Sequence, residues 1–101
     1  MPKNLYSAES AVLRRLLRTA REQAGVTQAA LSEALGRNQS FISDIERGVR
    51  RIDTVELWQL CKALGLDVVA FVAEFREAAE AETNKPIRPA RRGSGSPRRR
   101  S

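Results

Sequence analysis

Histidine is absent from the 101 residues, and cysteine occurs once, as Cys61. These two shortages exclude a Ser-His-Asp triad, a Cys-His pair and a zinc site with its usual ligands. The sequence also lacks a glycine-rich phosphate loop and clustered inward carboxylates, so we expect neither an enzyme nor a metal or cofactor. A single thiol forms no internal disulfide, which favours a reducing cytoplasm.

Long apolar runs are missing as well. The longest is 68–73, six residues, whereas a membrane-spanning helix needs about 20. The first six residues, MPKNLY, lack the apolar stretch of a secretory signal. We therefore expect a cytoplasmic protein without a membrane partner.

Positive charge is concentrated near the C-terminus. The net charge is +6, but residues 85–101 hold seven basic residues and no acid, whereas residues 1–84 hold 11 basic and 12 acidic residues. The high isoelectric point alone therefore does not indicate a nucleic-acid partner. We assign 83–101 to a disordered Arg-rich tail, because it contains three prolines, two glycines and three serines, and Ile87 is its only large apolar residue. This tail is either an electrostatic arm for phosphates or a solubilising segment.

Helical periodicity fills the region before the tail and predicts a compact all-α domain of five helices at 9–82, after a short lead at 1–8. Glycine follows four of the periodic runs, where a left-handed residue ends a helix easily. The expected helices are 9–24, 28–35 and 39–47, then one from about 53 and one from about 67. Their expected caps are Ser7 or Ser10, Thr27, Asn38, and Asp53 with Glu56. On the last helix we expect four side chains to point inward: Val68, Val69, Val72 and Phe75.

The second and third helices are the most informative pair. A tight glycine turn joins them, so two short helices with apolar faces must cross steeply. The outward face of the third helix is small and polar, with Gln39, Ser40 and Ser43. Such a face fits the major groove of DNA, where it can exchange hydrogen bonds with base edges.

The stretch 27–48, TQAALSEALGRNQSFISDIERG, resembles the helix-turn-helix of Xre/Cro-type phage repressors, and the flanking segments 17–25 and 57–66 also match. The resemblance covers about residues 12–75. It implies a five-helix lambda-repressor-like domain that binds a palindromic operator as a homodimer, with recognition helix 39–47 in the major groove.

The resemblance also implies residue roles. Base edges would be read by Gln39, Ser40, Ser43, Asp44 and Phe41. DNA phosphates would be contacted by Gln28, Arg37, Asn38, Arg50 and Arg51. Gln28 would also brace the first residue of the recognition helix. Arg21 and Glu46 would form a buried structural ion pair.

Several of these roles have alternatives. Phe41 either contacts DNA, at a thymine methyl or along the backbone beside the groove, or packs against the second helix. Asp44 either accepts from cytosine or pairs with Arg47 or Arg37. Cys61 is expected to be an inert core thiol. Trp58 is either a rim residue of the core or a dimer contact.

These observations favour a transcriptional regulator that binds double-stranded DNA sequence-specifically. We expect it to be a repressor of bacterial or phage origin that is associated with the nucleoid. Two alternatives stay open. One is the antitoxin of a toxin–antitoxin pair, with a toxin as protein partner. The other is a protein-interaction module that has lost DNA binding, which the net charge of residues 1–84 and Asp44 favour.

Overall fold

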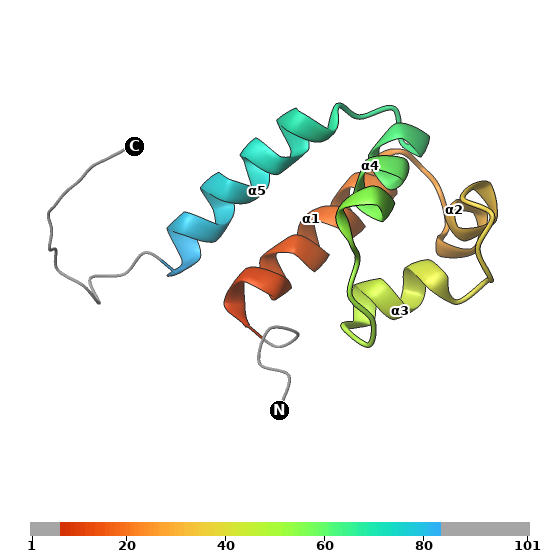
Figure 1. Cartoon of the computed structure of the whole chain (residues 1–101), viewed down its shortest axis with the longest axis horizontal. Coiled ribbons are helices and arrows are strands. Elements are labelled where there is room, and N and C mark those ends of the chain that lie inside the picture. The colour runs from red at the N-terminus through yellow and green to blue at the C-terminus, as the bar shows by residue number, and fades with distance from the viewer. Residues whose placement is uncertain (1–6, 84–101) are drawn as a thin grey trace, which may run out of the picture.

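The computed structural model describes residues 7–83, which form five α-helices and no strand (Figure 1). The helices are α1 (Ala8–Gln23), α2 (Gln28–Ala34), α3 (Phe41–Arg47), α4 (Thr54–Ala63) and α5 (Val68–Thr83). The predicted all-α class and helix number are confirmed. Most of the predicted lead and tail, residues 1–6 and 84–101, lies outside the described residues.

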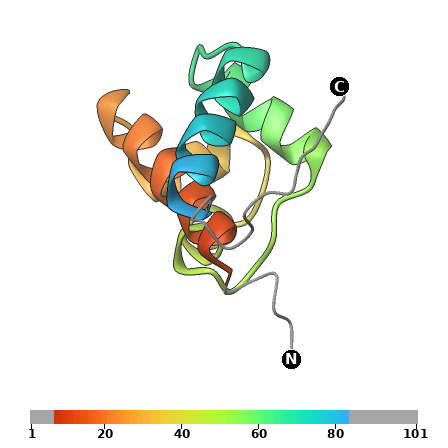
Figure 2. The same cartoon turned by 90° about the vertical axis from the view of Figure 1, so that its left-hand side faces the viewer.

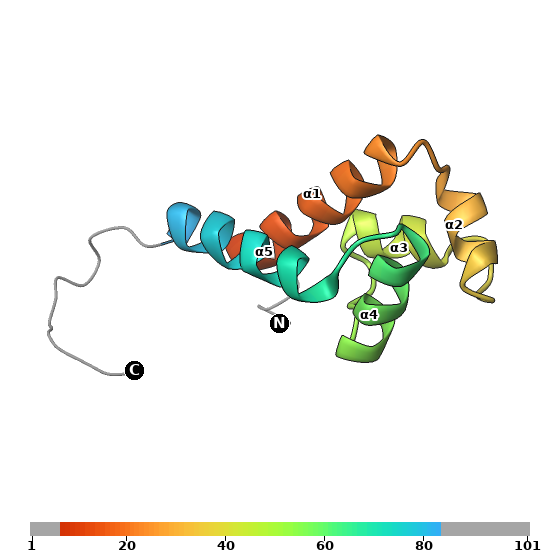
Figure 3. The same cartoon turned by 90° about the horizontal axis from the view of Figure 1, so that it is seen from above.

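Helix α1 is the central element of the domain. It packs against α5 on one side and α3 on another, while α2 packs against α3 and α4. The end of α5 lies beside the beginning of α1, and α2, α3 and α4 gather toward the other end (Figures 1, 2 and 3). The helix-turn-helix is thereby held by two neighbours, because α3 packs against α1 and α2 packs against α4.

Local side-chain caps begin three of the helices as the sequence predicts. Ser7, rather than Ser10, caps α1, because its Oγ accepts the Ser10 N–H at 3.0 Å. Thr27 accepts the Ala30 N–H at 3.0 Å. At α4, Asp53 accepts the Glu56 N–H at 2.7 Å, and the Glu56 carboxylate accepts the Asp53 N–H at 3.0 Å. These bonds satisfy backbone donors that a helix start would otherwise leave free.

The start of α3 was predicted two residues too early, and its cap was predicted wrongly. Gln39 and Ser40 form a turn, and the helix begins at Phe41 with Ser40 as its N-cap residue. Asn38 caps this turn instead: its Oδ1 accepts from the Ser40 N–H at 3.1 Å and the Ser40 hydroxyl at 3.0 Å. The Phe41 N–H donates to the Asn38 carbonyl at 3.0 Å, which closes the turn.

The core brings together apolar side chains from every helix: Leu17, Leu31, Phe41, Ile42, Ile45, Leu60, Cys61 and Phe71. On α5 the predicted inward face was partly wrong. Val69 is 72% exposed and Val72 is 43% exposed, whereas Phe71 and Ala79 are buried. The unbroken run 68–73 contains no polar residue to fix the rotation of the helix, and packing on α1 selects the row of Phe71, Phe75 and Ala79, spaced by four residues.

The four glycines that follow helices have φ between 70° and 81°, which confirms left-handed helix ends. Gly48, which ends α3, is also crowded. A Cβ at this position would lie 3.1 Å from Cζ of Arg14 on α1. Glycine therefore serves the backbone conformation, and any larger residue would also require the guanidinium of Arg14 to shift.

Candidate nucleic-acid interface

A buried serine joins the two helices of the helix-turn-helix. Ser32 on α2 is 0% exposed, and its Oγ accepts the Ile42 N–H of α3 at 3.0 Å. The Ser32 carbonyl accepts the Arg37 N–H at 3.0 Å. One residue of α2 thus fixes both the turn and the first turn of α3. Sequence reasoning missed Ser32; the available signal was a polar residue beside Leu31 on the inward face of a short helix.

The predicted reading residues lie together at the beginning of α3. Gln39 and Ser40 are exposed, whereas Ser43 and Asp44 are half-buried. The Ser43 hydroxyl donates to the Ser40 carbonyl at 3.1 Å. Of the alternatives for Asp44, the structure shows the ion pair with Arg47, at 2.7 Å. The face is therefore polar, and its single carboxylate is partly neutralised.

Arg21 and Glu46 form the ion pair that the resemblance implies, between α1 and α3. Nε of Arg21 donates to Oε2 of Glu46 at 2.7 Å, and the side chains are 10% and 6% exposed. Arg21 also donates to the Val26 carbonyl at 2.8 Å. The hydrogen bond to the Glu46 carboxylate is the main reason that the pKa of Arg21 is raised. This pair locks the C-terminal part of α3 onto α1.

The Gln28 amide bonds the same carboxylate. This contact differs from the implied one, in which Gln28 braces the first residue of the recognition helix. Its Nε2 donates to Oε1 of Glu46 at 2.7 Å, not to Gln39 at the start of the reading face. Gln28 is half-buried at the first position of α2. It thus links α2 to the ion pair and fixes how α2 sits on α3.

Phe41 lies in the core, only 5% exposed. Of its two alternatives, packing is the one that this burial supports, and a contact of its ring with a thymine methyl is not supported. Two guanidinium groups cover the ring: Cζ of Arg37 lies 4.1 Å and Cζ of Arg50 4.7 Å from its centroid. Such cation–π contacts are favourable, more so when they are shielded from water.

Glu56 on α4 binds both of these arginines. Its carboxylate accepts two hydrogen bonds from Arg50, at 3.0 and 2.9 Å, and one from Arg37 at 3.0 Å. The bonds from Arg50 are the main reason that the pKa of Glu56 is lowered from 4.5 to about 2, and the same contact raises the pKa of Arg50. Sequence reasoning saw Glu56 only as a capping residue and missed this cluster.

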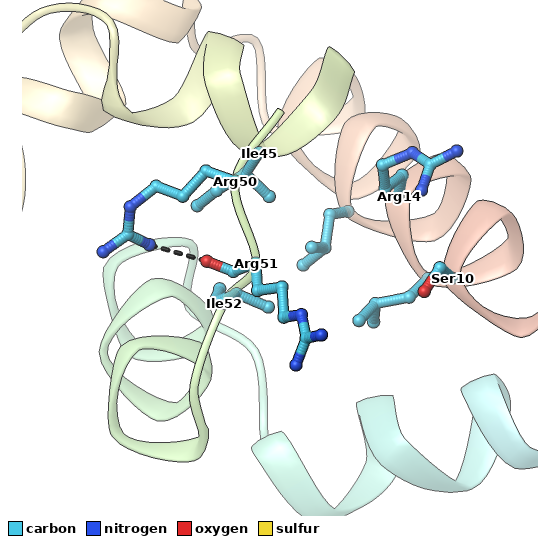
Figure 4. A pocket seen from close by; sticks show the side chains of 8 residues that line it. Ser10, Arg14, Ile45, Arg50, Arg51 and Ile52 are labelled. Carbon is cyan, nitrogen blue, oxygen red and sulfur yellow. Dashed lines mark hydrogen bonds between the residues drawn. The ribbon is translucent and has the colours of Figure 1, made fainter. Parts of the chain in front are cut away.

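The two loop arginines after α3 differ in their surroundings. Figure 4 shows that the Arg50 side chain extends away from a small cavity between α1, α3 and the loop, and that it bonds the Arg51 carbonyl, at 2.7 Å. The cavity measures about 130 Å³ and has an apolar floor that includes Leu17, Ile45 and Ile52. Arg51 is exposed.

The comparisons with known proteins place this geometry in a family. The chain matches the family model of a helix-turn-helix domain over residues 12–75. It is 37% identical to an XRE-family like protein from Pseudomonas syringae pv. tomato str. DC3000, with 75% of this chain and 93% of that chain covered and a TM-score of 0.69. The chain belongs to the Xre family of helix-turn-helix proteins.

Two further solved structures resemble this Xre-family chain. The clp gene regulator ClgR from Corynebacterium glutamicum is 27% identical, with 77% of this chain and 83% of that chain covered and a TM-score of 0.67. A mutant of the restriction-modification controller protein C.Esp1396I is 25% identical, with 71% and 91% covered and a TM-score of 0.65. No curated protein sequence matches the chain.

The remaining residues singled out by the sequence lie away from α3 or in the core. Cys61 is 0% exposed, and burial raises the pKa of its thiol. Trp58 on α4 is 49% exposed, and Nζ of Lys62 lies 5.0 Å from its ring centroid. Between residues 7 and 83 no cluster of side chains is suited to hold a metal ion, and no helix in this range is long and apolar enough to cross a membrane.

Proposed function

We propose that this Xre-family protein is a sequence-specific transcriptional regulator that inserts the beginning of α3 into the major groove of an operator. The observation that carries the proposal is Gln39. Its side chain is exposed, and within residues 7–83 its amide has no hydrogen-bond partner, so the amide is available to a base. Glutamine bonds adenine at N6 and N7 with matching geometry.

The neighbouring polar residues extend this reading face. Ser40 and Ser43 are short, so we propose that they reach bases or phosphates directly or through water. Asp44 is the candidate acceptor for the amino group of cytosine. Its ion pair with Arg47 reduces the repulsion that a carboxylate would otherwise exert on DNA phosphates.

Phosphate contacts are proposed on both sides of α3. Arg51 is exposed and lies in the loop after the recognition helix, which suits it to the DNA backbone. Asn38 and Gln28 lie at the turn and at the start of α2. Arg37 and Arg50 complete this set, although both also bond Glu56.

Action as a dimeric repressor is the finer part of the proposal. The similar proteins named above as a gene regulator and a controller protein support regulation. Exposed apolar side chains on α4 and α5, Val55, Trp58, Val69 and Val72, support an interface with a second copy. A two-fold dimer would bind a palindromic operator, and its occupation of a promoter would exclude polymerase.

Selection of bound duplexes from a random DNA library tests the proposal. The intact chain is used at near-physiological salt, and the recovered duplexes are sequenced. We expect a palindrome with half-sites about one helical turn apart. A single unrepeated half-site would refute the dimer, whereas DNA without a motif would refute sequence-specific reading. Recovery of no DNA would refute the proposal and favour a protein partner, such as a toxin.

A further inference from the structure

The cluster around Glu56 connects three segments that flank the proposed reading face. Arg37 comes from the turn before α3, Arg50 from the loop after it, and Glu56 from the first turn of α4. The Glu56 side chain, at the junction, is 11% exposed, whereas those of Arg37 and Arg50 are 36% and 35% exposed. The carboxylate thus lies inside, and the two guanidinium groups reach solvent.

The ring of Phe41 limits how these arginines can move. Both guanidinium groups lie within 4.7 Å of its centroid, and the ring is fixed in the core. Each arginine is therefore held by a carboxylate and by a ring face together. Long cationic side chains lose much rotational freedom when they bind a partner, so prior ordering of this kind favours binding.

Charge and hydrogen-bonding capacity remain available after these contacts. Two guanidinium groups share one carboxylate, so the cluster keeps a net positive charge of one. A guanidinium has five N–H donors, and the two groups together make four hydrogen bonds, three to Glu56 and one to the Arg51 carbonyl. A DNA phosphodiester carries one negative charge and accepts hydrogen bonds, so it matches the net positive charge and the unused N–H donors of the cluster.

A hollow beside the cluster opens at the reading face. It measures about 140 Å³ and is lined by Arg37, Asn38, Ser40, Phe41, Asp44 and Arg50. Asp44 is the one acid in this lining, and its carboxylate is bonded to Arg47. The hollow therefore adjoins both arginines and the exposed Ser40.

We propose that Glu56 is a positioning residue for DNA binding, which holds Arg37 and Arg50 on Phe41 so that both bind one backbone phosphate beside Ser40. The inference rests on the proposed function and adds a residue that does not itself touch DNA. Glu56 differs in this respect from an ordinary acid near the interface, whose charge would only repel the phosphates.

One substitution separates these two roles, because they predict opposite changes in the affinity for DNA. Glu56→Gln removes a negative charge near the DNA, so charge alone would tighten binding. Loss of positioning would weaken it, by about tenfold if one charge-assisted contact to phosphate is lost. The slope of log affinity against log salt should also fall in magnitude by about one. The variant would neutralise one phosphate fewer, so fewer counterions would be released from the DNA on binding.

Asp53→Ala is the matched control. Like Glu56→Gln, it removes one negative charge from the start of α4. It also removes the carboxylate that accepts the Glu56 N–H, but it keeps the Glu56 side chain and its three bonds with the arginines. We expect its affinity for DNA and its salt slope to equal those of the unchanged chain, or its binding to be slightly tighter. Titrations of a selected duplex by fluorescence anisotropy at several salt concentrations give both quantities.

The inference is overturned if Glu56→Gln binds as tightly as the unchanged chain or tighter, or if Asp53→Ala weakens binding equally. Should Glu56→Gln fail to fold, Arg37→Lys replaces it, because this variant keeps the charge and the capping box but loses the planar guanidinium. Its affinity for DNA should fall about threefold, less than the tenfold expected when a full contact is lost. An unchanged affinity refutes the inference. If the unchanged chain binds no duplex, the proposed function itself has failed.

Discussion

Replacement of Glu46 by alanine should lower the free energy of unfolding by about 3–5 kcal/mol, because it leaves a buried charge without its counter-charge. The carboxylate accepts from Arg21 at 2.7 and 3.2 Å and from Gln28 at 2.7 Å. Without it, the 8% exposed Arg21 keeps its bond to the Val26 carbonyl at 2.8 Å. Its nearest remaining carboxylate is that of Glu22, at 3.9 Å and 53% exposed.

This loss is large beside the total stability of a domain of this size, about 4–12 kcal/mol. The midpoint of thermal unfolding should fall by at least about 12 °C. Urea denaturation followed by far-ultraviolet circular dichroism measures the difference directly. The double variant Arg21→Met with Glu46→Leu should lose less than Glu46→Ala, because it leaves no unpaired charge.

Glu22→Ala is the control for this prediction. Glu22 is an exposed acid on α1 that bonds Arg18 at 3.1 Å, so its removal should lower stability by about 0.5 kcal/mol or less. If Glu46→Ala were no more destabilising than Glu22→Ala, the role of the buried pair in holding α3 on α1 would be refuted.

Two further predictions concern α4 and the end of α3. The pKa of Glu56 is lowered from 4.5 to about 2 by its bonds with the arginines, so its contribution is complete above pH 4.5 and is lost as the pH falls toward 2. Between pH 4.5 and 2 we expect the free energy of unfolding to fall by about 1–2 kcal/mol, after allowance for solvent screening, and we expect no such loss in Glu56→Gln. Equal acid sensitivity of the two chains would contradict a stabilising role for the ionised Glu56. Gly48→Ala should destabilise the chain by more than about 1 kcal/mol and by more than Gly36→Ala. Both have positive φ, but only the Cβ at Gly48 meets a side chain, that of Arg14, so equal losses in urea denaturation would refute the crowding argument.

Features that depend on neighbouring residues could be predicted from the sequence. Thr27 and Asp53 were recognised as caps because a helix start is decided within four residues. The glycines were recognised as helix ends for the same reason. Gln39 and Ser40 were expected at the reading face, and both are exposed there, although in a turn rather than in the helix.

Features that depend on packing between helices could not be predicted in this way. Ser32 caps α3 from α2, ten residues away, so no local pattern shows why α3 begins at Phe41. The rotation of α5 is decided by contact with α1, since a run without polar residues fits several rotations. The bond between Arg50 and Glu56 depends on the path of the intervening loop, which neither residue type determines.

The reading of bases by the turn 39–40 and the beginning of α3 is the central claim, and Gln39→Ala tests it most directly. The affinities of this variant and of the unchanged chain are measured for the selected operator and for each of its single base-pair variants. We expect the variant to lose about 1–3 kcal/mol and to lose discrimination at one base pair in each half-site while keeping it elsewhere. Discrimination that is unchanged at every position would contradict the account.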